Sequence, residues 1–443
     1  MKTDPLDLPL RAVAHRIEAG RLSAVDILSA TSARIRRRDP ALRSVVHLSD
    51  PALPEEGPFA GLSIGIKDLF DVDGAPTRCG SHAHHGSGPE GTAIRRLRAA
   101  GLTPLAKLAT YEYALTGPAW DQPNPPARNP WNPDHITGGS SSGSAAAVAG
   151  GLFRAALGTD TGGSIRSPAA YCGIVGIKPT HGTVPDDGCV ALAPSLDVVG
   201  PLGVCVEDAA VVLEILAPET RATYMLGQGI EGLSIGYARD WFVHDPACHP
   251  DVIRALDDTA AILSQLGARI ALVSLSDYAP LEAAGCVILQ REAWEAHHDR
   301  LAAHWQAYGK DARRNLVTGA VLTDAHVATA RALARRFRAE VDRQLVSHAA
   351  LLTPTTLSPA PRFSDFEDGP VWTAMRTLPF NMSGHPALSV PCGFAENGLP
   401  LGAQLVGSHG HEALLCRIAQ AFERATPASA TLPLSADPIT LDP

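Results

Sequence analysis

The sequence has few of the features with which proteins bind nucleic acid or cross a membrane. Its 443 residues carry a formal net charge of -9, and the longest basic block is the three arginines at 36–38. A nucleic-acid-binding surface needs clustered Lys and Arg, so we expect no nucleic-acid partner. The longest apolar stretches, such as 145–153, are far shorter than the roughly 20 residues that span a bilayer, so we expect no membrane association.

Cysteine and lysine are also scarce, and each scarcity is informative. The eight cysteines form no CxxC pair and show no regular spacing, which favours buried free thiols in a reducing compartment. The N-terminal MKTDPLDLPL lacks the apolar core of a signal peptide, so we expect a cytoplasmic, bacterial protein. Only five lysines stand beside 32 arginines, so the setting of each lysine needs an explanation.

Apolar residues alternate between helical and strand spacing along almost the whole chain. Helical patterns occur at 7–37, 92–100, 144–150, 206–216, 250–266, 281–303, 324–347 and 411–424. Strand patterns occur at 62–67, 102–108, 151–158, 232–237, 269–274, 350–353, 387–391 and 402–406. No repeat or linker divides the chain. The alternation predicts one α/β domain, with a central sheet covered by α-helices on both faces and a helical cap over about 281–347.

Two segments rich in glycine and serine are candidates for chemistry. TGGSSSGS (137–144) is compatible with a linker, a phosphate loop or an active site. A linker does not lead directly into a helix, and a phosphate loop needs a lysine after its glycines. In GTDTGGSIR (158–166), two glycines before Ser164 allow several backbone N–H groups to converge, as an oxyanion hole requires. A tight turn with a capping serine is the competing interpretation, and taken by itself such a turn is commoner than a catalytic one.

A reactive serine needs a base, and the sequence offers two kinds. Seventeen histidines are present, but none stands in a convincing motif, and the cluster in SHAHHGSG (81–88) is a remote metal-site alternative. Lys67 ends the apolar strand pattern at 62–67, where burial lowers the pKa of an amine. The competing interpretation is an ordinary ion pair between Lys67 and Asp68 or Asp71.

Together these segments resemble the amidase signature family of serine hydrolases. The resemblance rests on GLSIGIKDLFDVDG (61–74), GGSSSGSAAAVAGG (138–151) and LGTDTGGSIRSPAAYCGIVGIKPT (157–180), with weaker matches continuing to residue 424. It implies an amidase signature domain over 1–443 with a mixed central sheet. Within it we expect an N-terminal helical segment over about 1–58 and a signature core over about 60–215.

The resemblance also implies roles for individual residues. Ser164 matches the acylated nucleophile, Lys67 the base, and Ser140 the bridging serine, whose peptide bond with Gly139 is expected to be cis. The remaining implied residues are Thr161, Gly162 and Gly163 for the oxyanion hole, with Ser164 as a further N–H donor, and Ser141, Asp160 and Arg166 as supporting residues. Neither a cofactor nor a metal is expected.

The expected reaction is hydrolysis of an amide C–N bond through an acyl-enzyme, with a small amide as substrate and Tyr113 and Trp120 lining its pocket. Alternatives are a carbamate or ester hydrolase with the same triad, and, in another class, the glutaminase subunit of a tRNA-dependent amidotransferase. A homodimer is a hypothesis that no motif tests.

Overall fold

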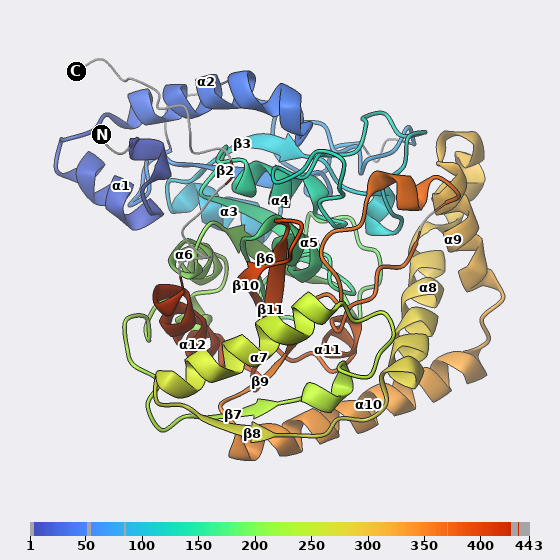
Figure 1. The fold of residues 1–443 in the computed structure, drawn as a ribbon. Coiled ribbons are helices and arrows are strands. Elements are labelled where there is room, and N and C mark those ends of the chain that lie inside the picture. Colours follow the sequence, from blue (N-terminus) through green and yellow to red (C-terminus); the bar gives the residue numbers. More distant parts are fainter. Residues whose placement is uncertain (1–3, 51–54, 84–85, 370, 427–432, 434–443) are drawn as a thin grey trace.

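An eleven-stranded sheet runs through the computed structural model, which describes residues 4–50, 55–83, 86–369, 371–426 and 433. The strands lie in the order β1-β3-β2-β4-β6-β5-β10-β11-β9-β7-β8 (Figure 1). Pairing is parallel among β3, β2 and β4 and among β9, β7 and β8, and antiparallel elsewhere. The expected α/β fold with a mixed central sheet is therefore confirmed.

The strand bounds are β1 (Val45–Leu48), β2 (Ser63–Lys67), β3 (Thr103–Leu108), β4 (Ala155–Asp160), β5 (Val175–Lys178), β6 (Val198–Gly203), β7 (Ser234–Tyr237), β8 (Arg269–Leu272), β9 (Ala350–Pro354), β10 (Ala387–Phe394) and β11 (Pro400–Val406). The helix bounds are α1 (Leu10–Glu18), α2 (Ala24–Leu42), α3 (Thr92–Ala99), α4 (Ser142–Ala149), α5 (Arg166–Cys172), α6 (Val206–Leu216), α7 (Pro250–Gln265), α8 (Tyr278–Ala303), α9 (Lys310–Ala320), α10 (Asp324–Ser347), α11 (Leu378–Met382) and α12 (Glu412–Ala425).

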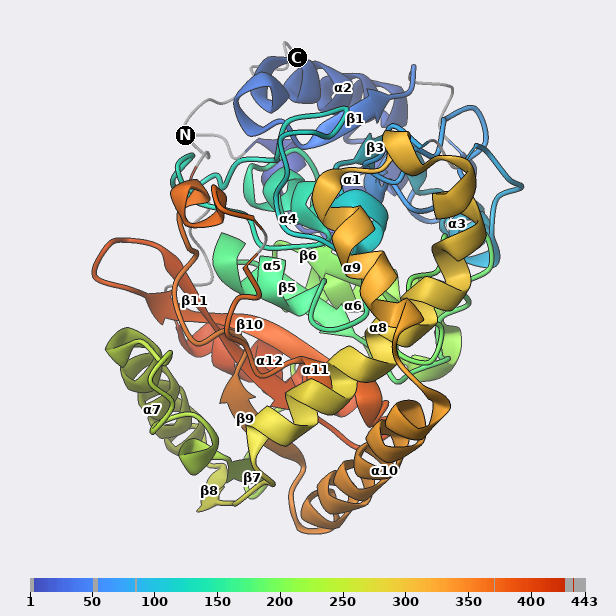
Figure 2. The same ribbon diagram turned by 90° about the vertical axis from the view of Figure 1, so that its right-hand side faces the viewer.

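Helices cover both faces of the sheet. Helices α3, α6, α7 and α12 pack on one face, with α1 against α6. Helices α4 and α5 pack on the other face, where α8, α9 and α10 also lie, as Figure 2 shows in yellow and orange. The spacing of apolar residues explains why these helices pack on the sheet. In α6, Val206, Ala209 and Leu213 are three and four positions apart, so they share one side of the helix, and all three are buried.

Helix α5 was not predicted from the sequence. All seven of its residues are buried, so it lacks the alternation of apolar and polar residues that marks a surface helix. Its proline, Pro168, occupies the first turn, where a missing N–H is tolerated. Helices α9 and α11 and strands β1, β5 and β6 were likewise not predicted. The cavity described below is built partly on these missed helices.

Candidate active site

Two parallel strands deliver the first polar residues to one edge of the sheet. Strand β2 ends at Lys67 and its parallel neighbour β4 ends at Asp160, so both residues lie at the carboxyl ends of their strands. Helix α4 packs on both strands, and Ser140 lies just before it. The loop 161–164 leads from β4 into α5. Sheet topology thus gathers segments that are about 100 residues apart in sequence.

Lys67 is completely buried and makes its closest contacts to hydroxyl groups. Its Nζ lies 2.8 Å from the Oγ of Ser140 and 2.8 Å from the Oγ1 of Thr159. Burial lowers the pKa of the Lys67 ammonium from its ordinary value of 10.5 to about 7, because the charged form loses its hydration. Near neutral pH this amine is therefore poised to accept or donate a proton.

The competing interpretation of Lys67 as an ordinary ion-pair partner is wrong. Asp68 pairs instead with the buried Lys107, whose Nζ lies 2.9 Å from its Oδ1. Asp71 accepts a hydrogen bond from the hydroxyl of Thr77. Across the described ranges, no carboxylate comes within 4.0 Å of the Lys67 Nζ. The two nearest acidic residues in the sequence are thus engaged elsewhere.

Both implied serines line one cavity of about 270 Å³. The peptide bond between Gly139 and Ser140 is cis, as the resemblance predicts. The N–H of Ser141 donates to the carbonyl of Ser164 at 3.2 Å, which ties the two segments together. The Ser164 hydroxyl makes no hydrogen bond within the described part of the chain, whereas the Ser140 hydroxyl contacts Lys67.

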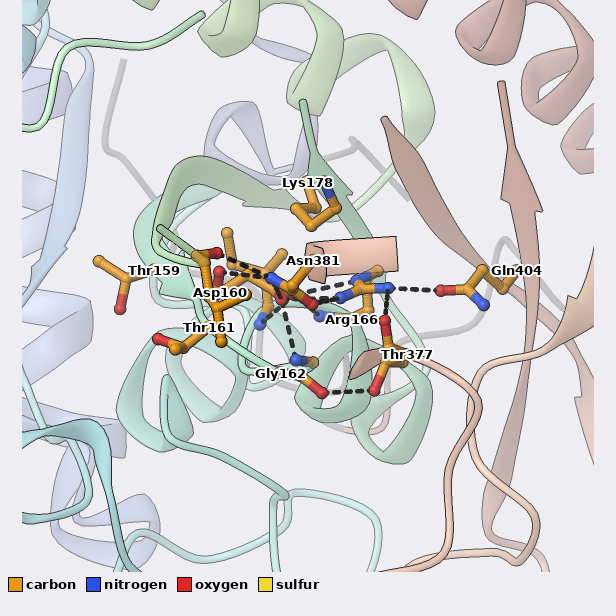
Figure 3. Close-up of polar contacts among 12 residues, drawn as sticks. Thr159, Asp160, Thr161, Gly162, Arg166, Lys178, Thr377, Asn381 and Gln404 are labelled. Atoms are coloured by element: carbon orange, nitrogen blue, oxygen red, sulfur yellow. Dashed lines mark hydrogen bonds and ion pairs between the residues drawn. The ribbon is translucent and has the colours of Figure 1, made fainter. Parts of the chain in front are cut away.

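A buried ion pair holds the loop that carries Ser164. Arg166 and Asp160 are both fully buried and lie 2.8 Å apart (Figure 3). Asp160 also accepts hydrogen bonds from the backbone N–H groups of Gly163 and Ile165. Burial alone would raise the pKa of Asp160, but the Arg166 charge, the hydrogen bonds from Arg166 and Asn381, and the nearby Lys178 together hold the pKa well below the usual range. Asp160 is therefore an anion whose hydrogen bonds hold the backbone of this loop.

Three further residues complete this network, and sequence reasoning missed them. Arg166 donates to the carbonyl of Thr377, to the Oδ1 of Asn381 and to the Oε1 of Gln404 (Figure 3). The hydroxyl of Thr377 also donates to the carbonyl of Gly162 at 2.6 Å. All three residues lie more than 200 positions beyond the loop. Asn381 and Gln404 fall within the weaker family resemblance that continues to residue 424, but no role is predicted for them.

The loop geometry changes the expected set of oxyanion donors. The N–H of Gly163 donates to Asp160 at 2.8 Å and is already engaged. The N–H groups of Thr161, Gly162 and Ser164 donate to no other described group, and all three residues line the cavity. Gly163 serves the loop in another way: its φ of +132° suits glycine, and a Cβ there would lie 2.3 Å from the Thr377 hydroxyl.

The two predicted pocket residues do not line the cavity. Tyr113 is buried and stacks on Tyr308 with ring centroids 5.0 Å apart, since the turn at 112–114 directs it into the core. Trp120 is 56% exposed and borders a separate surface hollow. Tyr111 lines the cavity instead.

The cavity walls come from four parts of the chain. They are the loop at 111–118, the glycine-serine segments, helices α8 and α9, and the segment at 366–375. Gln290 and Asn315 supply amide groups, while Leu289, Phe366 and Trp372 supply apolar surface. None of the lining residues in the described chain has a charged side chain. The cavity therefore suits a neutral, partly apolar molecule.

The histidine cluster in SHAHHGSG (81–88), the remote metal-site alternative, lies partly outside the described residues, which do not include His84 and His85. Another group of titratable residues is assembled by the fold: His385 lies beside Asp342 and His409. Within the described residues, no helix is both long and apolar enough to cross a bilayer.

Comparison with known proteins gives consistent matches over nearly the whole chain. The family model described as Amidase matches residues 26–416. A glutamyl-tRNA(Gln) amidotransferase subunit of Syntrophobacter fumaroxidans is 34% identical, covering 96% of this chain and 98% of the relative. A crystal structure of an amidase superposes with a TM-score of 0.84 at 32% identity, covering 94% of this chain and 99% of that one. The native peptide amidase from Stenotrophomonas maltophilia superposes with a TM-score of 0.79 at 28% identity, covering 94% and 96%.

These relatives bear on two of the sequence expectations. Other curated relatives carry the same amidotransferase name, which supports the amidotransferase alternative more strongly than the free-standing amidase. Because that name includes glutamyl-tRNA(Gln), it also conflicts with the expectation of no nucleic-acid partner.

Proposed function

The chain belongs to the amidase family, and on that premise we propose that it hydrolyses an amide C–N bond through an acyl intermediate on Ser164. The observation that carries the proposal is the contact of 2.8 Å between the Lys67 amine and the Ser140 hydroxyl. It joins a base with a pKa of about 7 to a serine that shares the cavity wall with Ser164.

The first half of the reaction forms the acyl-enzyme. Neutral Lys67 takes a proton from the Ser140 hydroxyl, and Ser140 takes the proton of Ser164 as the Ser164 Oγ attacks the substrate carbonyl carbon. The N–H groups of Thr161, Gly162 and Ser164 have no other partner among the described groups, so they are available to donate hydrogen bonds to the resulting oxyanion. These hydrogen bonds stabilise its negative charge. This assignment replaces Gly163, whose N–H serves Asp160.

The second half releases both products. Ser140 gives its proton to the substrate nitrogen and takes one back from Lys67, so the C–N bond breaks with a neutral amine or ammonia leaving and Lys67 is neutral again. A water molecule then attacks the ester carbonyl on Ser164 and passes its proton through the same relay. The carboxylic product leaves, and Ser164 regains its hydroxyl hydrogen.

The cavity indicates the substrate class. Its described lining residues carry no charge, so an acyl group with its own ammonium or carboxylate would lose hydration without gaining an ionic partner. Leu289, Phe366 and Trp372 instead offer apolar contacts. We therefore propose a neutral amide with an apolar or aromatic acyl group, with Gln290 and Asn315 available for hydrogen bonds.

A second candidate is the glutamine-hydrolysing subunit of a tRNA-dependent amidotransferase. The names of the curated relatives support it, at 34% to 36% identity over about 95% of the chain. The uncharged cavity weighs against it, because free glutamine carries both an ammonium and a carboxylate. A partner subunit that supplies charged groups would remove this objection.

One assay separates the two candidates. The purified chain is supplied with a series of neutral aryl and alkyl amides and, in parallel, with glutamine, and the release of amine or ammonia is measured. We expect kcat/KM for the best neutral amide to exceed that for glutamine by at least about 100-fold, since the loss of an ionic partner costs about 3 kcal/mol. Ser164→Ala is the background control. Glutamine hydrolysis that appears only with added amidotransferase subunits would instead favour the second candidate.

A further inference from the structure

Two histidines and an aspartate from three separate segments meet outside the cavity. Asp342 belongs to α10, His385 lies between α11 and β10, and His409 lies between β11 and α12. One ligand atom of each lies within 4.8 Å of the other two. The Asp342 Oδ1 is 3.0 Å from the His385 Nε2 and 3.7 Å from the His409 Nδ1.

One residue, Ser383, orients both imidazole rings. Its hydroxyl lies 3.0 Å from the Nδ1 of His385, and its backbone carbonyl lies 3.2 Å from the Nε2 of His409. Hydrogen bonds to the far nitrogen are how proteins fix histidines that bind metals. Both remaining nitrogens, the Nε2 of His385 and the Nδ1 of His409, face the carboxylate of Asp342.

The hydrogen bond to Ser383 fixes which nitrogen of His409 can bind a metal. The carbonyl of Ser383 only accepts, so the Nε2 of His409 carries a hydrogen. The other nitrogen, Nδ1, faces the Asp342 carboxylate at 3.7 Å. In a neutral ring this nitrogen has a lone pair, and neutral imidazole is the form that binds a metal ion.

Two basic residues lie close enough to this cluster to affect a cation bound there. Arg338 and the buried Lys178 both oppose a dication, so the expected affinity is moderate.

We propose that Asp342, His385 and His409 bind one zinc-type divalent cation, with a fourth coordination position open to water. Tetrahedral zinc with bonds of about 2.0–2.1 Å places its ligand atoms about 3.3 Å apart. The two separations from the Asp342 Oδ1, 3.0 and 3.7 Å, bracket that value, and the two histidine nitrogens lie within 4.8 Å of each other. The Asp342 side chain is 51% exposed, which gives an ion a path from solvent.

The position of this site predicts a structural role for the ion. Ser383 ends α11, the short helix whose Asn381 binds Asp160 and Arg166. A metal at His385 would tie α10 to the segment that follows α11, and so hold in place the residues that support the loop before Ser164. The ion touches none of the proposed reacting atoms and takes no part in acyl transfer.

The test uses the full chain after treatment with EDTA. Zinc or cobalt chloride is added, bound metal is measured by equilibrium dialysis, and thermal unfolding is followed with and without metal. We expect one ion per chain, a rise in Tm of a few degrees and visible absorption typical of four-coordinate cobalt. Asp342→Asn lowers the affinity at least about 10-fold, while Asp324→Asn, on the same helix, leaves it unchanged.

A second ligand variant and three contrary results complete the test. His409→Gln, at a partly exposed position, is a second ligand variant and loses the cobalt absorption if the proposal is right. Equal binding by the wild type and Asp342→Asn, no binding by the wild type, or binding without a rise in Tm would overturn it. Amide hydrolysis by the EDTA-treated chain is expected to persist below its Tm, so this proposal and the proposed function fail independently.

Discussion

The buried lysine makes a quantitative prediction for the pH dependence of the reaction. Lys67 must be neutral to accept a proton, and its pKa is about 7. At the ordinary value of 10.5, only about three molecules in 10,000 would carry a neutral amine at pH 7, whereas a pKa of about 7 makes that fraction about one half. Burial therefore raises the amount of active base more than about 1,000-fold.

The expected profile follows directly from this protonation. The kcat/KM of the wild type rises about tenfold per pH unit up to pH 7 and is level above it. Lys67→Met lowers the plateau about 100- to 10,000-fold, the usual contribution of general base catalysis, and removes the slope below pH 7. Initial rates from pH 5 to pH 9 with one neutral amide measure both quantities.

A matched control exists in Lys178, a second fully buried lysine whose pKa burial also lowers to about 7. Its Nζ contacts the carbonyl of Pro179, and it does not line the cavity. In Lys178→Met, kcat/KM is expected to keep its rise with pH below pH 7, whatever the effect of the substitution on the plateau value. A wild-type profile that is flat between pH 5 and pH 8, or a slope that survives in Lys67→Met, would refute the assignment of the base.

The same burial of Lys67 makes the free energy of unfolding depend on pH. Between pH 7 and pH 10.5 the unfolded chain binds a proton at Lys67 that the folded chain does not. Over this window Lys67 therefore raises the free energy of unfolding of the wild type by up to about 1.4 kcal/mol per pH unit. This rise is absent from Lys67→Met. Urea unfolding of the two proteins at several pH values measures the difference.

Other residues of the site give further predictions. Ser164→Ala lowers kcat/KM at least about 1,000-fold and prevents trapping of an acyl-enzyme by mass spectrometry; an acyl adduct in this variant would contradict the nucleophile assignment. Asp160→Asn leaves the Arg166 charge unpaired and lowers the free energy of unfolding by about 3–5 kcal/mol at pH 7. Because the pKa of Asp160 is depressed, this difference from the wild type narrows below pH 3.8, which acid unfolding curves check. Gly163→Ala forces a Cβ against Thr377 and lowers kcat more than it raises KM, whereas an unchanged kcat would show that the loop adapts.

The sequence was most informative where function depends on short segments. The family resemblance of the segment 157–180 implied Ser164 as the nucleophile and Asp160 and Arg166 as supporting residues. The short spacing of Asp160 and Arg166 accounts for their contact in the structure. The strand pattern at 62–67 likewise predicted a buried Lys67, because an apolar strand end excludes water. In both cases the chemistry follows from neighbours in the chain.

The sequence was least informative where function depends on residues far apart. Tyr113 and Tyr111 have the same type and nearly the same position, and only the turn at 112–114 decides which one lines the cavity. Asn381 and Gln404 carry no signal of their own, since any polar residue in a buried segment looks alike without its partner. The pairing of His385 with His409 was missed for the same reason.

The hydrogen bonds of Arg166 determine when the candidate site can form during synthesis of the chain. Its partners Thr377, Asn381 and Gln404 are translated more than 200 residues after it. A nascent chain that already contains Lys67, Ser140 and Ser164 therefore lacks the contacts that shape the loop. Activity is expected to appear only when the last third of the chain has left the ribosome, which protects a growing chain from premature chemistry.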